Sequence, residues 1–178
     1  MSEFKYWLIK TSSEDRCAEM RRQGAVTIDF DFLPDLSSLK KRDIQHKLTE
    51  QDSSLSQGDA ILQANQVLRF VDKIEIGDKV FLVYNESVSV AEVTSGYTYS
   101  GQASGVLSPH QRQAKWLVND QPLEHAPEGV RESMKEELAV GPVDKDYFHS
   151  LDSWLRDNFG LDIAQRPEEV AEKPWNLY

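Results

Sequence analysis

The sequence predicts a mixed fold of the α/β (α+β) class, because strand patterns and helix patterns alternate along the chain. The first observation is a hairpin at residues 76–93, where Gly77-Asp78 leads into an apolar run and the polar turn Asn85-Glu86-Ser87 precedes a second run. The second observation is an opening that reads strand, helix, strand. The third is helical periodicity at residues 59–72 and 144–159.

In the second run of the hairpin, apolar residues alternate with polar ones, as in Val88 and Val90 against Ser89 and Glu92. One face of this strand should therefore be buried, while the other should face solvent or a ligand. Aromatic and hydrogen-bonding residues follow the hairpin, which makes it the centre of the predicted site.

The N-terminal part is expected to form two strands around one helix. Residues 4–10 are aromatic and β-branched, as is typical of a strand. Ser12 or Ser13 caps the helix that follows, and Gly24 ends it. Residues 25–30 are predicted to form the second strand.

Further helices are expected on both sides of the hairpin. One is capped by Ser37 or Ser38 and reaches Leu48, and a polar connector at residues 49–58 leads to the amphipathic helix at 59–72. Three elements are predicted after the hairpin. They are a charged helix at residues 128–138, a short strand at 140–143 and a helix at 144–159.

Length and composition indicate one folded domain at residues 1–160, followed by an acidic C-terminal tail at 161–178. Apolar residues make up 39% of the chain, which is typical of a globular protein. No run reaches the roughly 18 to 20 apolar residues of a membrane span, and no signal peptide is visible, so we expect a cytoplasmic protein without membrane contact. Cys17 is the only cysteine, which excludes an intrachain disulfide and fits a reducing compartment.

The net charge of −10 argues against broad, nonspecific binding to a phosphate backbone. Much of the acid lies after Glu124, however, so a locally basic face is compatible with this total.

The chain lacks the usual catalytic signatures, such as a phosphate-cradling glycine loop, a nucleophile elbow or a histidine pair at metal-binding spacing. Asp29 and Asp31 could hold a metal, but such a pair is common by chance. We therefore expect no enzyme, no metal and no cofactor. A small hydrolase or transferase using Asp29, Asp31 and His110 ranks last among the functions considered, since no nucleophile accompanies them.

Aromatic residues flanked by amide, hydroxyl or carboxylate groups recur along the chain. Flat aromatic faces that sandwich a base, with polar groups that bind its edge, are what a pocket for a flipped or single-stranded base requires. Trp7 and Trp116 lie in predicted strands, where a large aromatic is also a common core residue. Tyr97 and Tyr99 are two residues apart in a predicted strand, so both side chains can face the same side.

Several segments between Tyr6 and Leu117 follow one another in the order and spacing of a known family. They are Tyr6-Trp7-Leu8-Ile9-Lys10, residues 62–70 leading into 76–80, residues 91–99, Pro109-His110-Gln111-Arg112 and Lys115-Trp116-Leu117. Together they resemble EVE domains of the PUA-like superfamily, with the closest likeness to EVE-like N-terminal modules of some modification-dependent restriction endonucleases. Where family members often have a Trp near the end of the second strand, this chain has Phe30-Asp31-Phe32.

The resemblance implies a PUA-like curved sheet or pseudo-β-barrel flanked by helices, and a pocket that receives a modified base. It also implies a module without catalytic residues of its own. The predicted base-binding pocket combines positions matched to the family with polar and aromatic residues beside the hairpin. They are Trp7, Lys10, Phe30, Asp31, Asn65, Gln66, Tyr97, Tyr99, His110, Arg112 and Trp116.

The first functional hypothesis is a non-catalytic reader of modified nucleobases. We expect methylated or hydroxymethylated cytosine, in DNA rather than RNA, and a role in restriction, defence or regulation with a separate effector such as a nuclease or helicase. In this hypothesis Tyr97 and Trp116 lie on facing strands beside the helix that carries Asn65 and Gln66, and the four form one concave site.

The second hypothesis is a protein-interaction or inhibitory module that keeps the fold without binding nucleic acid. Its basis is the net charge, the acidic helices after Glu124 and the terminal segment Pro174-Trp175-Asn176-Leu177-Tyr178. Such a surface would dock on a basic partner or imitate DNA.

Overall fold

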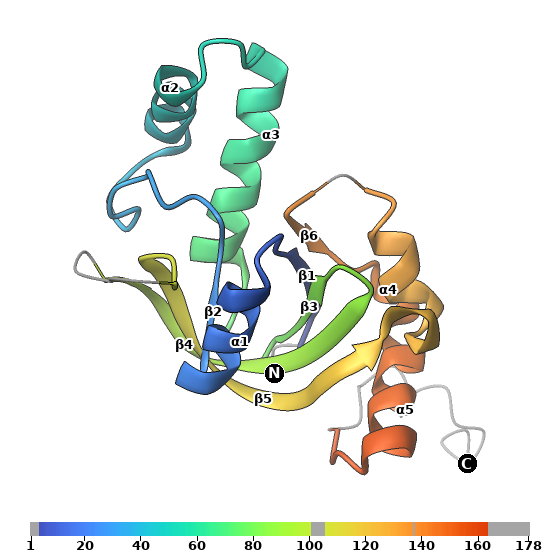
Figure 1. The fold of residues 1–178 in the computed structure, drawn as a ribbon. Helices are drawn as coiled ribbons and strands as arrows, with labels where there is room; N and C mark the ends of the chain where they lie inside the picture. Colours follow the sequence, from blue (N-terminus) through green and yellow to red (C-terminus); the bar gives the residue numbers. More distant parts are fainter. Residues whose placement is uncertain (1–3, 101–105, 137, 164–178) are drawn as a thin grey trace, which may run out of the picture.

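A curved six-stranded sheet forms the centre of the molecule (Figure 1). The computed structural model describes residues 4–100, 106–136 and 138–163. The strands follow the order β2-β5-β4-β3-β1-β6 across the sheet. They are β1 (Tyr6–Lys10), β2 (Ala25–Thr27), β3 (Lys79–Tyr84), β4 (Ser87–Tyr99), β5 (His110–Pro122) and β6 (Val140–Pro142). The predicted mixed fold with a curved sheet and flanking helices is confirmed.

The predicted hairpin is the β3–β4 pair, which is antiparallel with Tyr84 opposite Ser87. Asn85 takes the left-handed conformation at φ 55°, which a tight two-residue turn requires and which asparagine tolerates well. Strand β1 pairs in parallel with β3 and antiparallel with β6. The first and last strands of the described chain therefore lie side by side.

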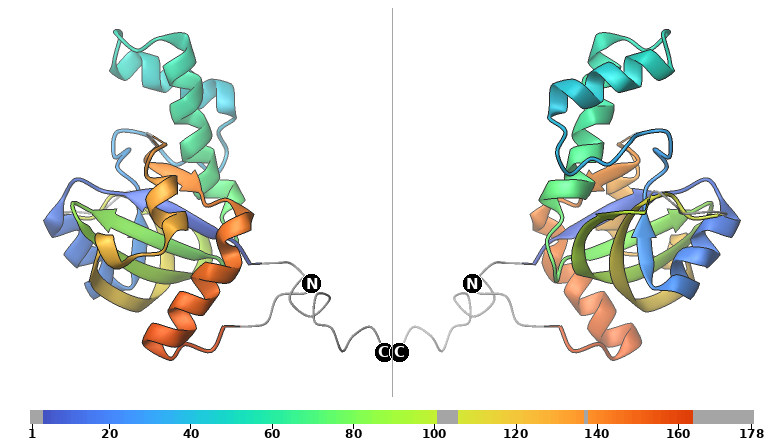
Figure 2. Two further views of the ribbon diagram at one scale, coloured as in Figure 1. Left: turned by 90° about the vertical axis from the view of Figure 1, so that its right-hand side faces the viewer. Right: turned by 90° about the vertical axis from the view of Figure 1, so that its left-hand side faces the viewer.

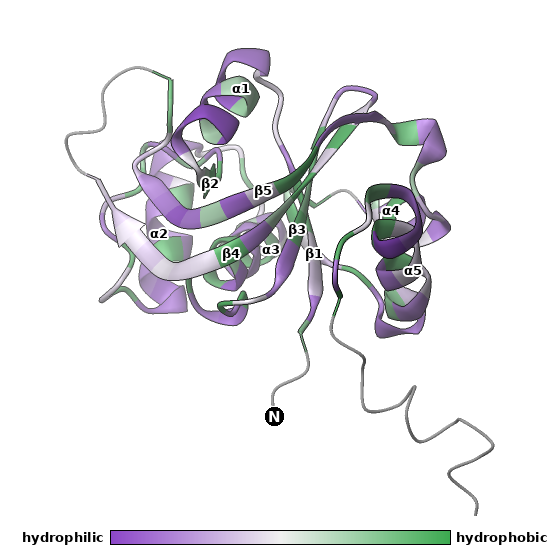
Figure 3. Cartoon of the chain, turned by 90° about the horizontal axis from the view of Figure 1, so that it is seen from below, coloured by the Kyte–Doolittle hydropathy of each residue, from purple (hydrophilic) through white to green (hydrophobic). Residues whose placement is uncertain are grey.

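Helices cover both faces of the sheet, with α1, α2 and α3 on one side and α4 and α5 on the other (Figure 3). Helices α2 and α3 stand out from the sheet as a hairpin of their own (Figures 1 and 2). The helical elements also include short 3₁₀ and π segments. They are α1 (Glu14–Gln23), α2 (Lys41–Gln51), α3 (Gln57–Leu68), the π-helix η1 (Arg69–Lys73), η2 (Leu123–His125), α4 (Glu128–Ser133), η3 (Lys145–Tyr147) and α5 (Phe148–Phe159).

Two hydrophobic cores fill the space between the sheet and these two layers of helices. Successive residues of β1 point into different cores: Trp7 and Ile9 lie in the α1–α3 core, while Tyr6 and Leu8 lie in the α4–α5 core. This alternation follows from the two-residue period of a strand. The middle of the sheet is therefore buried on both faces.

The expectation that one face of β4 would be open was wrong for its first half. Val88 and Val90 lie in the α4–α5 core, while Ala91 and Val93 lie in the α1–α3 core. Val88 and Val90 point to one face of the strand and Ala91 and Val93 to the other, as the two-residue period requires, and helices cover both faces. Only from Thr94 onward does the strand alternate between exposed and half-buried residues.

Several predicted boundaries were also wrong. The second strand ends at Thr27 instead of residue 30. Helix α2 begins after Lys40, because the Asp35 carboxylate accepts the backbone N–H of Ser37 and holds a turn there. The helix expected at residues 59–72 begins at Gln57 and changes to a π-helix at Arg69.

The C-terminal elements are shorter than predicted. Helix α4 ends at Ser133, well before residue 138, and α5 begins at Phe148 after a 3₁₀ turn. Most of the predicted acidic tail, residues 164–178, lies outside the described residues. No helix in the described ranges is long and apolar enough to cross a membrane.

Candidate functional site

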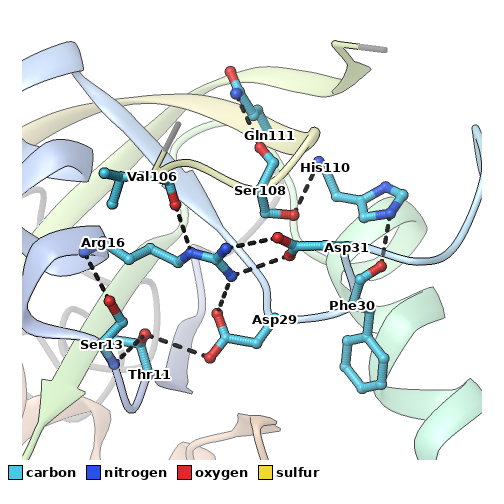
Figure 4. A network of polar contacts seen from close by, with 10 residues as sticks. All are labelled: Thr11, Ser13, Arg16, Asp29, Phe30, Asp31, Val106, Ser108, His110 and Gln111. Atoms are coloured by element: carbon cyan, nitrogen blue, oxygen red, sulfur yellow. Dashed lines mark hydrogen bonds and ion pairs between the residues drawn. The ribbon is translucent and has the colours of Figure 1, made fainter. Parts of the chain in front are cut away.

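Charged side chains from three segments meet where β1 ends, α1 begins and the chain leaves β2. The Arg16 guanidinium donates from Nη1 to Asp29 Oδ1 and from Nη2 to Asp31 Oδ2, each at 2.7 Å (Figure 4). Arg16 Nε donates to the carbonyl oxygen of Val106 at 2.9 Å. We call Arg16, Asp29 and Asp31 the acidic cluster, since two carboxylates face one cation.

Local structure holds each member of this cluster. Ser13 caps α1 by accepting the backbone N–H of Arg16 at 3.1 Å, which places Arg16 in the first turn of the helix. Thr11 accepts the Ser13 N–H and donates to Asp29 Oδ2 at 3.4 Å. Because β2 stops at Thr27, Asp29 and Asp31 lie outside the sheet, and both carboxylates reach Arg16.

The carboxylates are more open to solvent than the cation between them. The side chain of Arg16 is 15% exposed, that of Asp29 34% and that of Asp31 48%. Burial lowers the pKa of Arg16, but the hydrogen bonds of Asp31 and Asp29 outweigh it and raise this pKa above its ordinary value. Arg16 stays charged, and the carboxylate oxygens keep lone pairs free for further donors.

Two exposed apolar residues are neighbours of the acidic cluster: Phe32 follows Asp31 in the sequence, and Val106 is bound to Arg16 through its carbonyl oxygen. Phe32 is 46% exposed and Val106 39% exposed, although both are large and hydrophobic. The ring of Phe32 lies 6.5 Å from that of Phe30, which is buried in the α1–α3 core. The acidic cluster therefore has exposed apolar neighbours.

A chain of hydrogen bonds connects this region to β4 and β5 through His110. The Leu36 N–H donates to Tyr97 Oη at 3.2 Å, and Tyr97 Oη lies 2.8 Å from His110 Nδ1. His110 Nε2 lies 3.0 Å from the carbonyl oxygen of Phe30, so this nitrogen carries the proton and Nδ1 accepts from Tyr97. Tyr99 completes the aromatic group, with its ring 5.4 Å from that of His110.

His110 is a structural residue in this arrangement. It is fully buried, and burial lowers its pKa, so the imidazole is neutral near pH 7. Burial also raises the pKa of Tyr97 to about 12. Both ring nitrogens of His110 are engaged, which leaves none to accept a proton from a substrate, and the geometry does not support the hydrolase hypothesis.

A family comparison covers most of the site. The sequence model of a family described as "Domain of unknown function (DUF8426)" matches residues 4–137. The chain belongs to this family. The DUF8426 description does not name the EVE domain, so that assignment stays a prediction. No curated protein matches the chain.

Solved structures give distant likenesses to the DUF8426 chain. The YTH domain of the Zygosaccharomyces rouxii MRB1 protein in complex with N6-methyladenosine RNA is 13% identical, with 93% of this chain and 90% of that chain covered and a TM-score of 0.45. Protein Atu2648 from Agrobacterium tumefaciens is 15% identical, with 83% and 90% covered and a TM-score of 0.37. At this distance a likeness does not transfer a function.

Of the eleven predicted pocket residues, five gather at this end of the molecule: Phe30, Asp31, Tyr97, Tyr99 and His110. Only Asp31 belongs to the acidic cluster itself. Their contact with a base stays a prediction.

The predicted residues that lie elsewhere contribute mainly to the scaffold. Trp7 Nε1 donates to Asp78 at 2.9 Å in the interior. The Gln66 side chain is buried and accepts the Val140 N–H at 3.2 Å, and thus holds α3 to β6. Lys10 Nζ donates to two carbonyl oxygens beyond α4, those of Met134 and Glu136.

The concave site expected between Tyr97, Trp116, Asn65 and Gln66 is not formed. Tyr97 lies opposite Arg112 in the sheet, whereas Trp116 lies opposite Ala91. Trp116 Nε1 donates to the carbonyl oxygen of Met20 at 3.0 Å, beside α1. Three surface cavities formed by described residues lie elsewhere and contain none of the eleven predicted residues.

Arg16, Phe32 and Val106 were not predicted as site residues. One available signal was the pair Asp29 and Asp31, because two neighbouring carboxylates on one side of a chain attract a common cation. Within the described residues no group of three or more histidines, cysteines or acids is placed to hold a metal ion. Asp29 and Asp31 are instead bound by Arg16.

Proposed function

We propose that this DUF8426 chain is a non-catalytic reader of modified nucleobases, and that the acidic cluster binds the edge of the base. The observation that carries this proposal is two partly exposed carboxylates that are fixed by one guanidinium and followed in the sequence by an exposed phenylalanine. Each part has a role in base recognition.

The carboxylates of Asp29 and Asp31 are suited to bind amino groups. The N4 amino group of cytosine and the N6 amino group of adenine donate hydrogen bonds, and acidic side chains accept them. Because Arg16 already orients both carboxylates, binding costs little side-chain entropy. A base with an exocyclic amino group is therefore the chemistry that fits.

Phe32 and Val106 supply the apolar part of the proposed site. Stacking of a base on an aromatic ring is worth about 1 to 3 kcal/mol. A methyl group on the base adds apolar area that these exposed side chains can cover. Contacts of this kind allow a modified base to bind more tightly than its unmodified form.

In detail, we propose methylated or hydroxymethylated cytosine in DNA, in preference to RNA, as the ligand. The cytosine amino group would occupy one carboxylate, and a hydroxymethyl group has a hydroxyl that can donate to the other. The net charge of −10 keeps overall affinity modest. A separate effector protein such as a nuclease or helicase would act on the bound site.

Titration of matched oligonucleotides tests this function. Fluorescence anisotropy should compare DNA containing cytosine, methylcytosine or hydroxymethylcytosine, with N6-methyladenosine RNA as a further arm. We expect wild-type protein to bind one modified form at least about tenfold more tightly than its unmodified form, since one good contact is worth 1 to 3 kcal/mol. Equal or undetectable binding to every oligonucleotide would overturn the proposal.

The variant Asp31→Asn tests whether the ligand binds at the acidic cluster. It keeps the size of the side chain but removes one negative charge and an acceptor, so the preference for the modified form should fall to within about threefold of unity. Asp157→Asn is the matched control, because Asp157 is an exposed acid on α5. A preference that stays unchanged in Asp31→Asn would place the base elsewhere.

A second candidate function is the protein-interaction or inhibitory module. It is favoured by a cavity of about 530 Å³ between α4 and β6, whose lining includes Glu132, Glu136 and Asp144. A basic segment of a partner protein fits such a lining. Co-purification from native lysate separates the two functions. Recovery of nucleic acid without a partner protein would contradict the protein-interaction module.

A further inference from the structure

The protein is acidic overall, yet one projecting helix carries a basic run. Residues 40–47 hold four lysines and arginines, namely Lys40, Lys41, Arg42 and Lys47, against the single acid Asp43. Lys40, Lys41 and Arg42 are exposed, and Lys47 is half-buried. We refer to these four cations as the basic run.

The cations of the basic run lie outside the packing surface of α2, and three of the four are exposed. Ile44 and Leu48 are the buried residues of the helix, and both belong to the α1–α3 core. Helices α2 and α3 stand out from the sheet in two perpendicular directions of view (Figures 1 and 2). The cations are therefore presented to solvent on an outlying part of the molecule.

The cations of the basic run differ from those of α1 in their pairing. Among the residues that the structure describes, none of the four cations forms an ion pair. Arg16, Arg21 and Arg22 of α1, in contrast, each pair with an acid. Helix α1 also carries its acids in the first turn and its bases in the last, as the helix dipole prefers, whereas α2 begins with Lys41 and Arg42.

A groove lies next to the basic run, between α2 and the beginning of α3. Its volume is about 390 Å³, and Arg42, Gln45, His46 and Thr49 line one side of it. These four residues recur at spacings of three and four, so they share one face of α2. Arg42 and Gln45 can donate hydrogen bonds to an anion next to the exposed lysines.

We propose that this face of α2 binds the sugar-phosphate backbone of the nucleic acid whose base enters the acidic cluster. The inference rests on the proposed function, and it assigns the two tasks to separate surfaces: carboxylates bind the base, and the basic run neutralises phosphates. Charge complementarity identifies the partner, because clustered lysines and arginines supply the affinity of proteins for phosphate backbones.

The two surfaces are close enough to bind one nucleic acid molecule. The chain runs directly from the acidic cluster to α2 (Figure 1), and the nine residue steps from Asp31 to Lys40 span at most about 30 Å when fully extended. Phosphates of one strand of B-form DNA follow one another at about 3.4 Å along the helix axis. A site of about ten base pairs or fewer is therefore long enough to reach both.

The test removes the charge of the basic run and measures the salt dependence of binding. The triple variant Lys40→Gln/Lys41→Gln/Arg42→Gln should bind modified and unmodified oligonucleotides about tenfold more weakly at low salt, to the same degree for both. The slope of log K against log salt concentration should become shallower by about 2 to 3. The ratio of affinities for the two forms should stay at the wild-type value.

A matched control removes three exposed lysines on other elements, in Lys73→Gln/Lys115→Gln/Lys145→Gln. This variant should keep the wild-type slope to within about 1, which separates the basic run from net charge alone. Both variants should melt near wild type, because the changed side chains are exposed and glutamine is a good helix former.

The outcomes separate this inference from the function on which it rests. Wild-type discrimination together with an unchanged slope in the α2 variant overturns the inference and leaves the reader function standing. Undetectable binding of wild-type protein to all oligonucleotides overturns both. Cosedimentation with phosphatidylserine vesicles that the α2 variant abolishes, with unchanged oligonucleotide binding, would assign the basic run to a lipid surface instead.

Discussion

Two groups of charged residues in this protein differ in burial and in their hydrogen-bond partners. In the interior, the fully buried Asp78 accepts the backbone N–H groups of Lys5 and Glu75 and the Trp7 indole N–H, all at 2.9 Å. At the edge, the carboxylates of the acidic cluster bind a guanidinium and remain partly exposed. Asp78 faces fixed donors that only the folded chain provides.

Arg112 is the cationic counterpart of Asp78 in the interior. Its guanidinium donates to the carbonyl oxygens of Phe70, Ile74 and Ser95 at 2.6 to 3.1 Å, and thus holds the π-helix η1 against β4. Burial lowers the pKa of Arg112. Charges satisfied by backbone groups in the interior determine the fold, whereas charges paired with each other at the surface remain available to a ligand.

The largest effect on stability is expected when the interior group is disrupted. Asp78→Ala leaves three buried donors without an acceptor, so we expect the free energy of unfolding to fall by about 3 to 5 kcal/mol. Urea denaturation followed by circular dichroism measures this change. Asp157→Ala, at an exposed position, should stay within about 0.5 kcal/mol of wild type, and a similarly small effect of Asp78→Ala would contradict the structural role.

An intermediate effect is expected at His110, which is buried but uncharged. Its folded-state pKa is lowered by burial, so the unfolded chain binds the proton more readily, and stability is lost as pH falls below about 6.5. One such group changes stability by at most about 1.4 kcal/mol per pH unit.

Denaturation midpoints between pH 5 and 8 for wild type and His110→Gln measure this contribution. The difference in stability between the two proteins should shrink as pH falls, because only wild type loses the neutral imidazole. A difference independent of pH would show that His110 keeps the same protonation state in the folded and unfolded chains.

The smallest effect on stability is expected in the acidic cluster. Arg16→Gln should lower the free energy of unfolding by about 1 kcal/mol or less at low salt, and by less at 1 M salt, because partly exposed ion pairs are weak and screened. Arg22→Gln breaks the exposed pair with Glu19 and is the matched control. A loss above about 3 kcal/mol in Arg16→Gln would place this cluster with the interior group.

Local features of the fold could be predicted because neighbouring residues determine them. The cap at Ser13, the helix end at Gly24 and the turn at Asn85 depend on a few adjacent residues. The burial of both faces of β4 could not be predicted, since it depends on helices from both ends of the chain that pack on the two faces of the sheet.

The candidate site was predictable only in part for the same reason. Tyr97 and His110 come together because β4 and β5 are neighbouring antiparallel strands, in which Tyr99 is opposite His110 and Tyr97 is two residues further along the same face. Trp7 and Arg112 have side chains suited to a base pocket, but both are buried in the interior. Residue type alone does not show whether a side chain is buried. The ion-pair partner of Asp31 is Arg16, which could not be predicted because it lies in α1, before β2 in the sequence.

The position of β1 in the sheet also affects how the chain reaches its folded state. This strand lies between β3 and β6, with Tyr6 opposite Lys79 and Trp7 opposite Pro142. Both neighbours are synthesised much later, and at 5 to 20 residues per second β6 follows β1 by roughly ten seconds. Until β3 is synthesised, both edges of this apolar strand lack a partner, and one edge stays open to association with other chains until β6 follows. Late, non-local pairing of this kind makes folding slow.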